Sequence, residues 1–305
     1  MEIRNKRAVI TGAASGIGRA MAVKLAEEGA DVVLADMDED GLAVTRAEIE
    51  ALGRRAVAVR TDVSKLSDVE EMYRRAIATM GRVDILVNNA GVHLSGRPEM
   101  LSIADWEWVM GINFWGVVYG VSVFLPHFLE RGSGHIVNTS SIAGLIGWKD
   151  GSLPYTASKF AVVGLSEGLA VHLKSKGIGV TVVCPGLVMT NIGDHERRVA
   201  SGDGYDEARD VLRRIFKEHS REELQQLASM EILTPEEVAD QAIEAVKKDA
   251  FLVATHSETK EAMLHRATDM DGAIAEAAEH HSSQEERMAA FVDAIQNAPA
   301  HGQAN

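Results

Sequence analysis

Tyr155 and Lys159 are the residues of this sequence whose types and spacing most directly imply chemistry. They lie four positions apart in a stretch, 155–176, whose pattern predicts a helix, so both side chains share one face. Pro154, just before them, is typical of a helix start. A free tyrosine has a pKa of about 10, and a nearby ammonium and a helix N-terminus both favour its phenolate. The pair is therefore suited to moving a proton to or from a bound hydroxyl.

A second pattern with chemical meaning is the glycine-rich turn TGAASGIG at residues 11–18, which follows an apolar run and precedes a helical pattern. A strand, a turn and a helix N-terminus in this order form an anion site, because backbone N–H groups and the helix dipole point outward. Gly12 and Gly16 allow the backbone to approach a pyrophosphate, and Gly18 allows the helix to pack close to the sheet. The order of the elements predicts a dinucleotide-binding turn.

The choice of cofactor is predicted from Asp36, which ends the second apolar run eighteen residues after Gly18. A carboxylate there accepts hydrogen bonds from an adenosine ribose and repels a 2′-phosphate. Met37 follows it, and Ser15 occupies the turn position where a phosphate-binding Lys or Arg would stand. NAD is therefore favoured over NADP. The alternative is a solvated strand end, since residues 38–40 are also acidic.

The elements that position these residues follow from the alternation of apolar runs and helical patterns along the chain. Strands are expected at 8–12, 31–36, 56–62, 82–91, 134–141, 179–186 and 251–256, and helices at 16–28, 38–52, 102–129 and 155–176. Capping signals mark three helix starts, of which the second belongs to the helix at 102–129: Ser67 with Glu70, Ser102 with Asp105, and Thr234 with Pro235 and Glu237. Because the strand runs are continuously apolar, they are typical of a parallel sheet covered on both faces. The expected fold class is α/β, a Rossmann-type doubly wound parallel sheet of about seven strands with helices on both faces.

The chain resembles the short-chain dehydrogenase/reductase family over about residues 5–255. The resemblance is carried by TGxxxGIG at the first turn, NNAG at 88–91 and YxxxK from Tyr155 to Lys159, in the family's order and at suitable spacing. It implies the strand order 3-2-1-4-5-6-7 and hydride transfer between a nicotinamide cofactor and a CH–OH group. Tyr155 would be the general acid/base. The catalytic set that it implies is Asn113, Ser141, Tyr155 and Lys159.

Two of these residues gain a role only through the resemblance. Ser141, the second serine of IVNTSSIAG, matches the family's catalytic serine, and Ser140 is expected to point to the other face. Asn113 in MGINFWG matches the family's asparagine, which helps to hold a water for proton relay. Without the resemblance, Asn113 is a polar residue inside an apolar helix, which is more often a packing or cap feature.

The resemblance also implies the cofactor contacts. Asp62 matches the acid that contacts adenine, Lys159 binds the nicotinamide ribose, and the PGxVxT segment from Pro185 to Thr190 fixes the nicotinamide carboxamide. The complete set of cofactor-binding residues that we expect is Gly12, Ser15, Gly16, Ile17, Gly18, Asp36, Asp62, Val63, Asn89, Ala90, Gly91, Tyr155, Lys159, Pro185, Gly186, Val188 and Thr190.

The substrate pocket is expected beyond the carboxyl ends of the strands. The loops there are mostly apolar, which predicts a hydrophobic secondary alcohol or ketone as the small-molecule substrate, and residues 191–233 are expected to form a helical lid. For His93, a solvated loop histidine is an equally open alternative. The candidate substrate contacts are His93, Ile142, Trp148, Leu153, Leu187 and Ile192.

Composition excludes several other classes of protein. The 305 residues include 31 Lys and Arg against 45 Asp and Glu, a net charge of −14, and a pI near 5.3 argues against nonspecific binding to nucleic acid or to an anionic membrane. The single cysteine, Cys184, excludes an internal disulfide and fits a reducing compartment, and we expect it to be a core thiol. The N-terminus lacks the apolar region of a signal peptide, so a cytoplasmic location is expected. The apolar stretch 114–129 is too short to span a membrane.

Two units are expected, a single Rossmann domain over 1–256 and an acidic helical extension over 257–305. A typical family member ends soon after its last strand, and family members often form tetramers. The apolar helices favour a homo-oligomer here, and the altered ending leaves both a dimer and a tetramer open. His280 and His281 are adjacent and do not share a helix face, so no metal site is predicted.

Two alternatives of other classes remain. One is a catalytically silent NAD-binding sensor or scaffold, which the presence of all four catalytic residues disfavours. The other is epimerisation or dehydration of a nucleotide sugar, for which the segment 191–233 is small.

Overall fold

The computed structural model describes residues 1–147, 152–190, 192, 197–199, 221, 223 and 231–279. Its main sheet has seven strands in the order β3-β2-β1-β4-β6-β7-β9, and every pair of neighbours is parallel. Numbered along the chain, this is the expected order 3-2-1-4-5-6-7. The strands are β1 Arg7–Thr11, β2 Asp31–Asp36, β3 Ala56–Arg60, β4 Ile85–Asn88, β6 Gly134–Thr139, β7 Ile178–Cys184 and β9 Leu252–Ala254.

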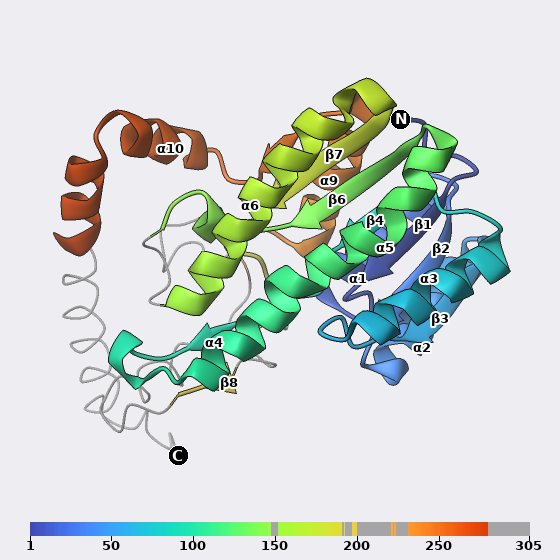
Figure 1. Ribbon diagram of the computed structural model, residues 1–305, viewed down its shortest axis with the longest axis horizontal. Coiled ribbons are helices and arrows are strands. Elements are labelled where there is room, and N and C mark those ends of the chain that lie inside the picture. Colours follow the sequence, from blue (N-terminus) through green and yellow to red (C-terminus); the bar gives the residue numbers. More distant parts are fainter. Residues whose placement is uncertain are drawn as a thin grey trace, which may run out of the picture.

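Helices cover both faces of this sheet. In Figure 1, α5 and α6 cross the near face and α1 and α9 lie behind the sheet. The helices are α1 Gly16–Glu27, α2 Glu39–Ala51, α3 Leu66–Met80, α4 Ile103–Met110, α5 Gly116–Arg131, α6 Leu153–Leu173, α9 Pro235–Lys248 and α10 Thr259–Thr268. Short turns of helix are η1 Pro98–Met100, η2 Gly111–Trp115, η3 Ile142–Gly144 and η4 Lys174–Lys176.

The central strand β1 shows why the strand sequences are apolar throughout. Ala8 and Ile10 lie in the core shared with α1, α2 and α9, whereas Val9 lies in the core shared with α3, α5 and α6. All three side chains are fully buried. Because successive side chains point to opposite faces and both faces are covered, the three inner positions of the strand are all apolar.

The last long helix of the described chain, α9, packs on the first, α1. Val238 and Ala242 of α9 belong to the same core as Met21 of α1. Lys24 forms an ion pair with Asp240 at 2.7 Å across this contact. The layer behind the sheet is therefore built from both ends of the Rossmann unit.

Two of the three capping predictions are confirmed. Ser102 with Asp105 and Thr234 with Glu237 form reciprocal capping boxes at the starts of α4 and α9. The prediction for Ser67 with Glu70 is wrong. Helix α3 begins earlier, at Leu66, because the carbonyl of Lys65 already accepts hydrogen bonds from the first turn.

The long apolar region Ile103–Arg131 contains a π-helical turn, η2, between α4 and α5. By length and composition alone this region could cross a membrane, a test that core helices of soluble proteins also pass. Phe124 and Phe128 are fully buried against the sheet, as in a core helix.

Outside the main sheet, a two-residue parallel pair joins β5 (Leu94–Ser95) to β8 (Arg197–Arg198). This pair was not predicted. Arg197 also binds the buried Asp105 of α4 at 3.3 Å.

Several predicted features lie outside the described residues: most of the lid, Trp148, and residues 280–305 with His280 and His281.

The extension begins with α10, which projects away from the sheet (Figure 1). Its Ala262 and Met263 pack against a small core cluster that includes Leu145 and Ile146, which follow β6. The described part of the extension is therefore helical and touches the loop that follows Ser141.

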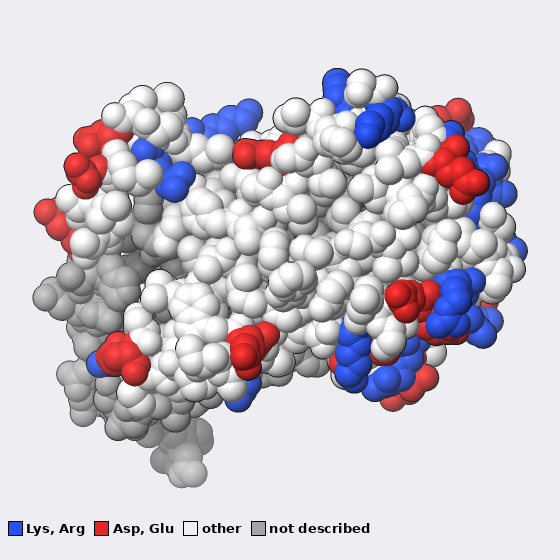
Figure 2. Space-filling model, in the orientation of Figure 1, with Lys and Arg blue, Asp and Glu red and all other residues white. Residues whose placement is uncertain are grey.

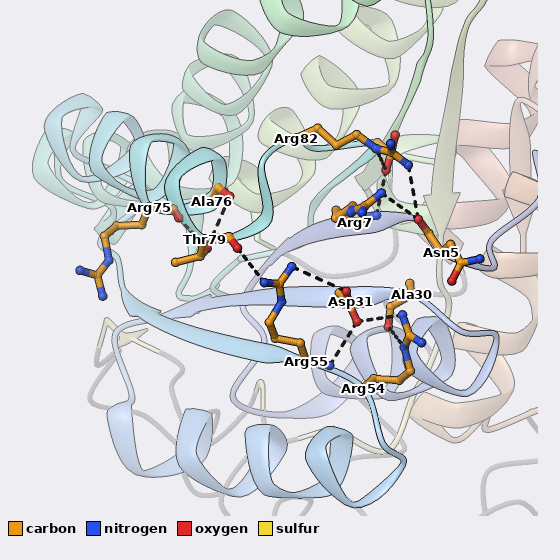
Figure 3. Close-up of polar contacts among 11 residues, drawn as sticks. Asn5, Arg7, Ala30, Asp31, Arg54, Arg55, Arg75, Ala76, Thr79 and Arg82 are labelled. Carbon is orange, nitrogen blue, oxygen red and sulfur yellow. Dashed lines mark hydrogen bonds and ion pairs between the residues drawn. The ribbon is translucent and has the colours of Figure 1, made fainter.

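The amino edge of the sheet is closed by arginine–aspartate pairs (Figure 3). Asp31 binds Arg54 at 2.8 Å and Arg55 at 3.7 Å. Asp84, which is almost completely buried, accepts a hydrogen bond from Arg82 at 3.1 Å. At this edge each of the two carboxylates is therefore engaged by arginine side chains.

Candidate active site

Thr11 ties together the strands at the carboxyl edge. Its hydroxyl oxygen accepts hydrogen bonds from the backbone N–H groups of Asn89 at 2.9 Å and Ala90 at 3.1 Å. The Asn89 carboxamide donates to the Thr11 carbonyl at 3.1 Å and accepts from the Thr139 hydroxyl at 3.2 Å. Side chains at the ends of β1, β4 and β6 thus form one network. Thr11 was not among the predicted site residues, although it directly precedes the first glycine of the turn.

The glycine turn has the geometry that an anion site requires. Gly12 and Gly16 adopt φ of +68° and +53°, the left-handed region that favours glycine. A Cβ on Gly18 would overlap the Gly12 carbonyl oxygen. Ser15 precedes α1 in an extended conformation without capping it, and the first turn of α1 has no acidic side chain. The N–H groups at this helix start therefore fit a pyrophosphate.

Asp36 faces the glycine turn. One carboxylate oxygen accepts a hydrogen bond from the Ala14 N–H and the other from the Asp38 N–H, each at 3.1 Å. The contact with Ala14 orients the carboxylate beside the turn, where the ribose of a bound dinucleotide would lie. This geometry distinguishes Asp36 from a strand end that only meets solvent.

Asp62 lies at the end of β3 in a turn of its own. Its carboxylate accepts hydrogen bonds from Ser64 at 2.6 Å and pairs with Lys65 at 3.1 Å. Partial burial opposes its charge, but these hydrogen bonds outweigh burial, so the pKa of the Asp62 carboxyl lies below its usual value. Val63, beside it, packs against Gly116 of α5.

Lys159 is the buried cation of the site. Its ammonium donates to the Thr139 carbonyl at 3.1 Å and lies 5.4 Å from the centre of the Tyr155 ring. Burial lowers the pKa of Lys159 to about 8. A Cβ on Gly91 would lie 3.4 Å from both Lys159 Nζ and Asn113 Oδ1, so a small residue there lets the loop after β4 reach both side chains.

Asn113 lies in the π-helical turn η2 and is almost completely buried. Its carboxamide accepts from the Val92 N–H at 2.8 Å and donates to the Val92 carbonyl at 3.0 Å and to Ser158 at 3.2 Å. These contacts hold the loop after β4 against α6. π-turns are frequent at functional sites, and this one was not predicted.

The neighbouring serines have different partners, as expected. Ser140 donates to the Lys159 carbonyl at 2.8 Å and so holds α6 against β6. The Ser141 hydroxyl accepts from the Ala143 N–H at 3.1 Å and lies 3.4 Å from the Pro185 carbonyl. Ser141 therefore faces the segment that follows β7.

Tyr155 lies in the first turn of α6, with 8% of its surface exposed. The His93 ring meets it edge to face, with ring centroids 4.9 Å apart. The structure therefore places His93, one of the predicted substrate contacts, directly against the predicted base.

The Pro185–Thr190 strip runs from Ser141 back to the glycine turn. The Pro185 carbonyl accepts from Ile142 N–H at 2.9 Å. Val188 pairs with Leu233. A Cβ on Gly16 would lie 3.4 Å from the Thr190 methyl group. The strip thus spans the distance between the catalytic candidates and the pyrophosphate turn.

The other substrate candidates border this region with their side chains accessible. Leu153 and Ile192 are 44% and 41% exposed, and Ile142 and Leu187 are half-buried.

Cys184 is fully buried, and burial raises the pKa of its thiol to about 12. A thiol in that state is a core residue, as predicted.

The fold, the glycine turn and the Tyr–Lys pair define a Rossmann-type oxidoreductase, and a family model agrees. The model described as "short chain dehydrogenase" matches residues 6–200, and the chain belongs to this family.

Individual relatives support the same assignment. 3beta-hydroxysteroid dehydrogenase 2 of Eggerthella lenta is 42% identical over 197 residues, 63% of this chain and 74% of that protein. Meso-2,3-butanediol dehydrogenase of Serratia marcescens is 42% identical over 193 residues, 63% of this chain and 75% of that protein. A solved short-chain dehydrogenase/reductase of Burkholderia phymatum, in complex with NAD, superimposes with a TM-score of 0.77 at 36% identity, covering 89% of this chain and 96% of that one.

Proposed function

We propose that the protein is an NAD-dependent oxidoreductase that interconverts a hydrophobic secondary alcohol and its ketone. The observation that carries the proposal is the buried Lys159 ammonium beside the Tyr155 ring, at the carboxyl edge of the sheet. A cation held there in a poorly solvated place stabilises the phenolate form of a neighbouring phenol. The Pro185–Thr190 strip connects this pair to a glycine turn and helix start that fit a pyrophosphate.

Bound NAD would supply the hydride acceptor for oxidation, and NADH the hydride donor for reduction. Tyr155 takes the proton of the substrate hydroxyl during oxidation and returns it to the carbonyl oxygen during reduction. Ser141 holds the substrate oxygen, and Lys159 stabilises the Tyr155 phenolate and binds the nicotinamide ribose. Asn113 keeps the loop after β4 in place and helps to hold the relay water.

NAD is preferred over NADP because Asp36 lies beside the turn and excludes a 2′-phosphate. Ser15 offers the turn no positive charge. The solved Burkholderia phymatum relative is a complex with NAD, which is consistent with this preference.

The substrate is expected to be an apolar molecule of moderate size. The accessible side chains of Leu153 and Ile192, with the half-buried Leu187, would line its path. The names of the two curated relatives, a hydroxysteroid and a butanediol dehydrogenase, are compatible with a secondary alcohol. The enzyme is proposed to act in the cytoplasm as a homo-oligomer.

The deciding experiment supplies the pure protein with NAD or with NADP and a panel of apolar secondary alcohols, including hydroxysteroids and aryl-alkyl carbinols. Reduced cofactor should form with NAD and not with NADP. Turnover with NADP alone would overturn the assignment of Asp36. NAD binding without turnover of any alcohol would favour the alternative, a catalytically silent NAD-binding sensor.

A further inference from the structure

A buried threonine–histidine pair joins three segments next to the Pro185–Thr190 strip. Thr255 and His256 follow β9, and only 2% of the His256 surface is exposed. The Gly186 N–H donates to the Thr255 hydroxyl oxygen at 3.3 Å. The imidazole Nδ1 lies 2.8 Å from that same oxygen, and Nε2 lies 3.2 Å from the Glu231 carbonyl oxygen.

The partners determine which imidazole nitrogen carries the proton. A carbonyl oxygen only accepts, so Nε2 of His256 must donate to Glu231. In the tautomer with its proton on Nε2, the imidazole accepts at Nδ1, and the Thr255 hydroxyl donates to it while accepting from Gly186. One continuous chain of hydrogen bonds therefore runs from the strip to the segment at 231, and each donor in it has an acceptor.

The strip is held from two sides. A Cβ on Gly186 would lie 2.6 Å from His256 Nδ1, so the ring rests directly against the strip backbone. On the other side, Leu233 N–H donates to Leu187 at 3.0 Å and Met189 N–H donates to Leu233 at 2.9 Å. Because Glu231 lies two residues before Leu233, His256 holds both the strip and the backbone that pairs with it.

We infer that Thr255 and His256 are positioning residues for the nicotinamide half of the cofactor site. The inference rests on the proposed function and on the role expected for the Pro185–Thr190 strip, which is to fix the nicotinamide carboxamide. Neither side chain belongs to a predicted motif, and both act through backbone: Gly186 on the strip and Glu231 beside it. The adenine half of the site, at Asp36 and Asp62, lies at the other end of the sheet edge, beyond β1.

The test compares two ligands that differ in the nicotinamide ring. NADH and ADP-ribose share the adenosine and pyrophosphate, and ADP-ribose lacks the nicotinamide. Calorimetric titration of His256→Ala and Thr255→Val should show NADH affinity reduced about tenfold, the usual effect of a lost buried hydrogen bond. ADP-ribose affinity should stay within about twofold of the wild type.

Matched variants separate positioning from general destabilisation. His135 is a second buried histidine of the same sheet, with Nε2 2.8 Å from the Thr181 hydroxyl, at the amino edge. His135→Ala should lower the thermal midpoint and leave both affinities unchanged. Thr255→Ser keeps the hydroxyl and should keep the NADH affinity that Thr255→Val loses. If His256→Ala does not fold, the comparison of Thr255→Val with Thr255→Ser serves as the test, because valine is nearly isosteric with threonine and serine keeps the hydroxyl.

Equal losses for NADH and ADP-ribose, or no loss for either, would overturn the inference. Its failure is distinguishable from that of the proposed function. A wild-type protein that binds both ligands but oxidises no alcohol refutes the proposed reaction, while a selective loss of NADH affinity in the variants still supports positioning. A wild-type protein that binds neither ligand refutes both.

Discussion

Tyr155 is the residue on which the proposed chemistry depends. In the variant Tyr155→Phe the ring and its contact with His93 remain, and only the hydroxyl is lost. General acid/base groups contribute about 100- to 10,000-fold to rate, so we expect kcat to fall at least about 100-fold.

NAD should still bind to this variant. Turnover and calorimetric titration on the same preparation provide the comparison, and the wild type is the control. Substantial residual turnover with intact binding would show that another group serves as the base.

Burial of Lys159 makes the charged form of its side chain energetically costly. Burial lowers its pKa from 10.5 to about 8, which corresponds to a cost of about 3 kcal/mol at ~1.4 kcal/mol per pH unit. The variant Lys159→Met fills the same space without the charge. We expect it to be more stable by up to about 3 kcal/mol and to lose activity, the trade between stability and function that active sites show.

The pH dependence of this gain has a definite sign. Below about pH 8 the ammonium is charged in both the folded and the unfolded chain, so the cost is present in full. Between about 8 and 10.5 the unfolded chain binds more protons, so wild-type stability from this group rises with pH. Urea unfolding of both proteins should show the gap closing over that range. A gap that is constant with pH would mean that the ammonium costs nothing.

The motif residues could be predicted from sequence because their roles depend on type and spacing. Gly12, Tyr155 and Lys159 are examples. The contacts of Thr11 and His256, and the hydrogen bonds between the Val92 backbone and Asn113, could not be predicted in this way. They join segments far apart in the chain, and no sequence pattern marks a single threonine, histidine or valine as a partner in such a contact.

At the scale of elements, β6 carries a titratable group at its amino end. His135 is buried beside Thr181 and lies 4.0 Å from Asp249, and burial lowers its pKa to about 4. In the unfolded chain it binds a proton below about pH 6.5. Stability from this group is therefore complete above pH 6.5 and is lost as pH falls toward 4.

The variant His135→Gln keeps a donor for Thr181 and removes the titration. We expect wild-type stability to fall by up to about 3 kcal/mol more than that of the variant over this range, at ~1.4 kcal/mol per pH unit. Denaturant midpoints measured at steps between those limits test this, and the carboxylates titrate alike in both proteins. Parallel curves would mean that His135 is not neutral in the folded state.

The strands were predictable as a class because a doubly covered sheet needs unbroken apolar runs. Their limits were less predictable: the run at 82–91 forms a strand only over Ile85–Asn88, and the next residue, Asn89, binds Thr11 instead of continuing the strand. The π-turn η2 was not predictable, because one extra residue in a turn leaves the apolar pattern unbroken. The β5–β8 pair is two residues long, too short for any alternation to show.

At the scale of the molecule, the face formed by α5 and α6 is poor in charge. Figure 2 shows few Lys, Arg, Asp or Glu side chains across the middle of this view, where Figure 1 places the two helices. Among the exposed apolar residues of these elements are Trp115, at the end of η2 just before α5, with 47% of its surface exposed, and Val171 of α6, with 83%. Exposed apolar side chains on an uncharged face are typical of interfaces, which supports the proposed homo-oligomer.

We expect the protein to sediment as a dimer or tetramer and the double variant Trp115→Glu with Val171→Glu to sediment as a smaller species. Val44→Glu is the matched control, since Val44 is 52% exposed on α2, on the other face of the sheet. A wild-type protein that sediments as a monomer would refute the interface. An equal effect of Val44→Glu would assign it to misfolding.

The packing of α9 on α1 has a consequence for the order of events during synthesis. Lys247 binds Glu28, 219 positions earlier in the chain, so one face of the first helix stays bare while the intervening chain is made. At about 5–20 residues per second, that interval lasts about 10–40 s. A nascent chain that stalls before α9 would leave the side of α1 that packs on Val238 and Ala242 without its partner throughout.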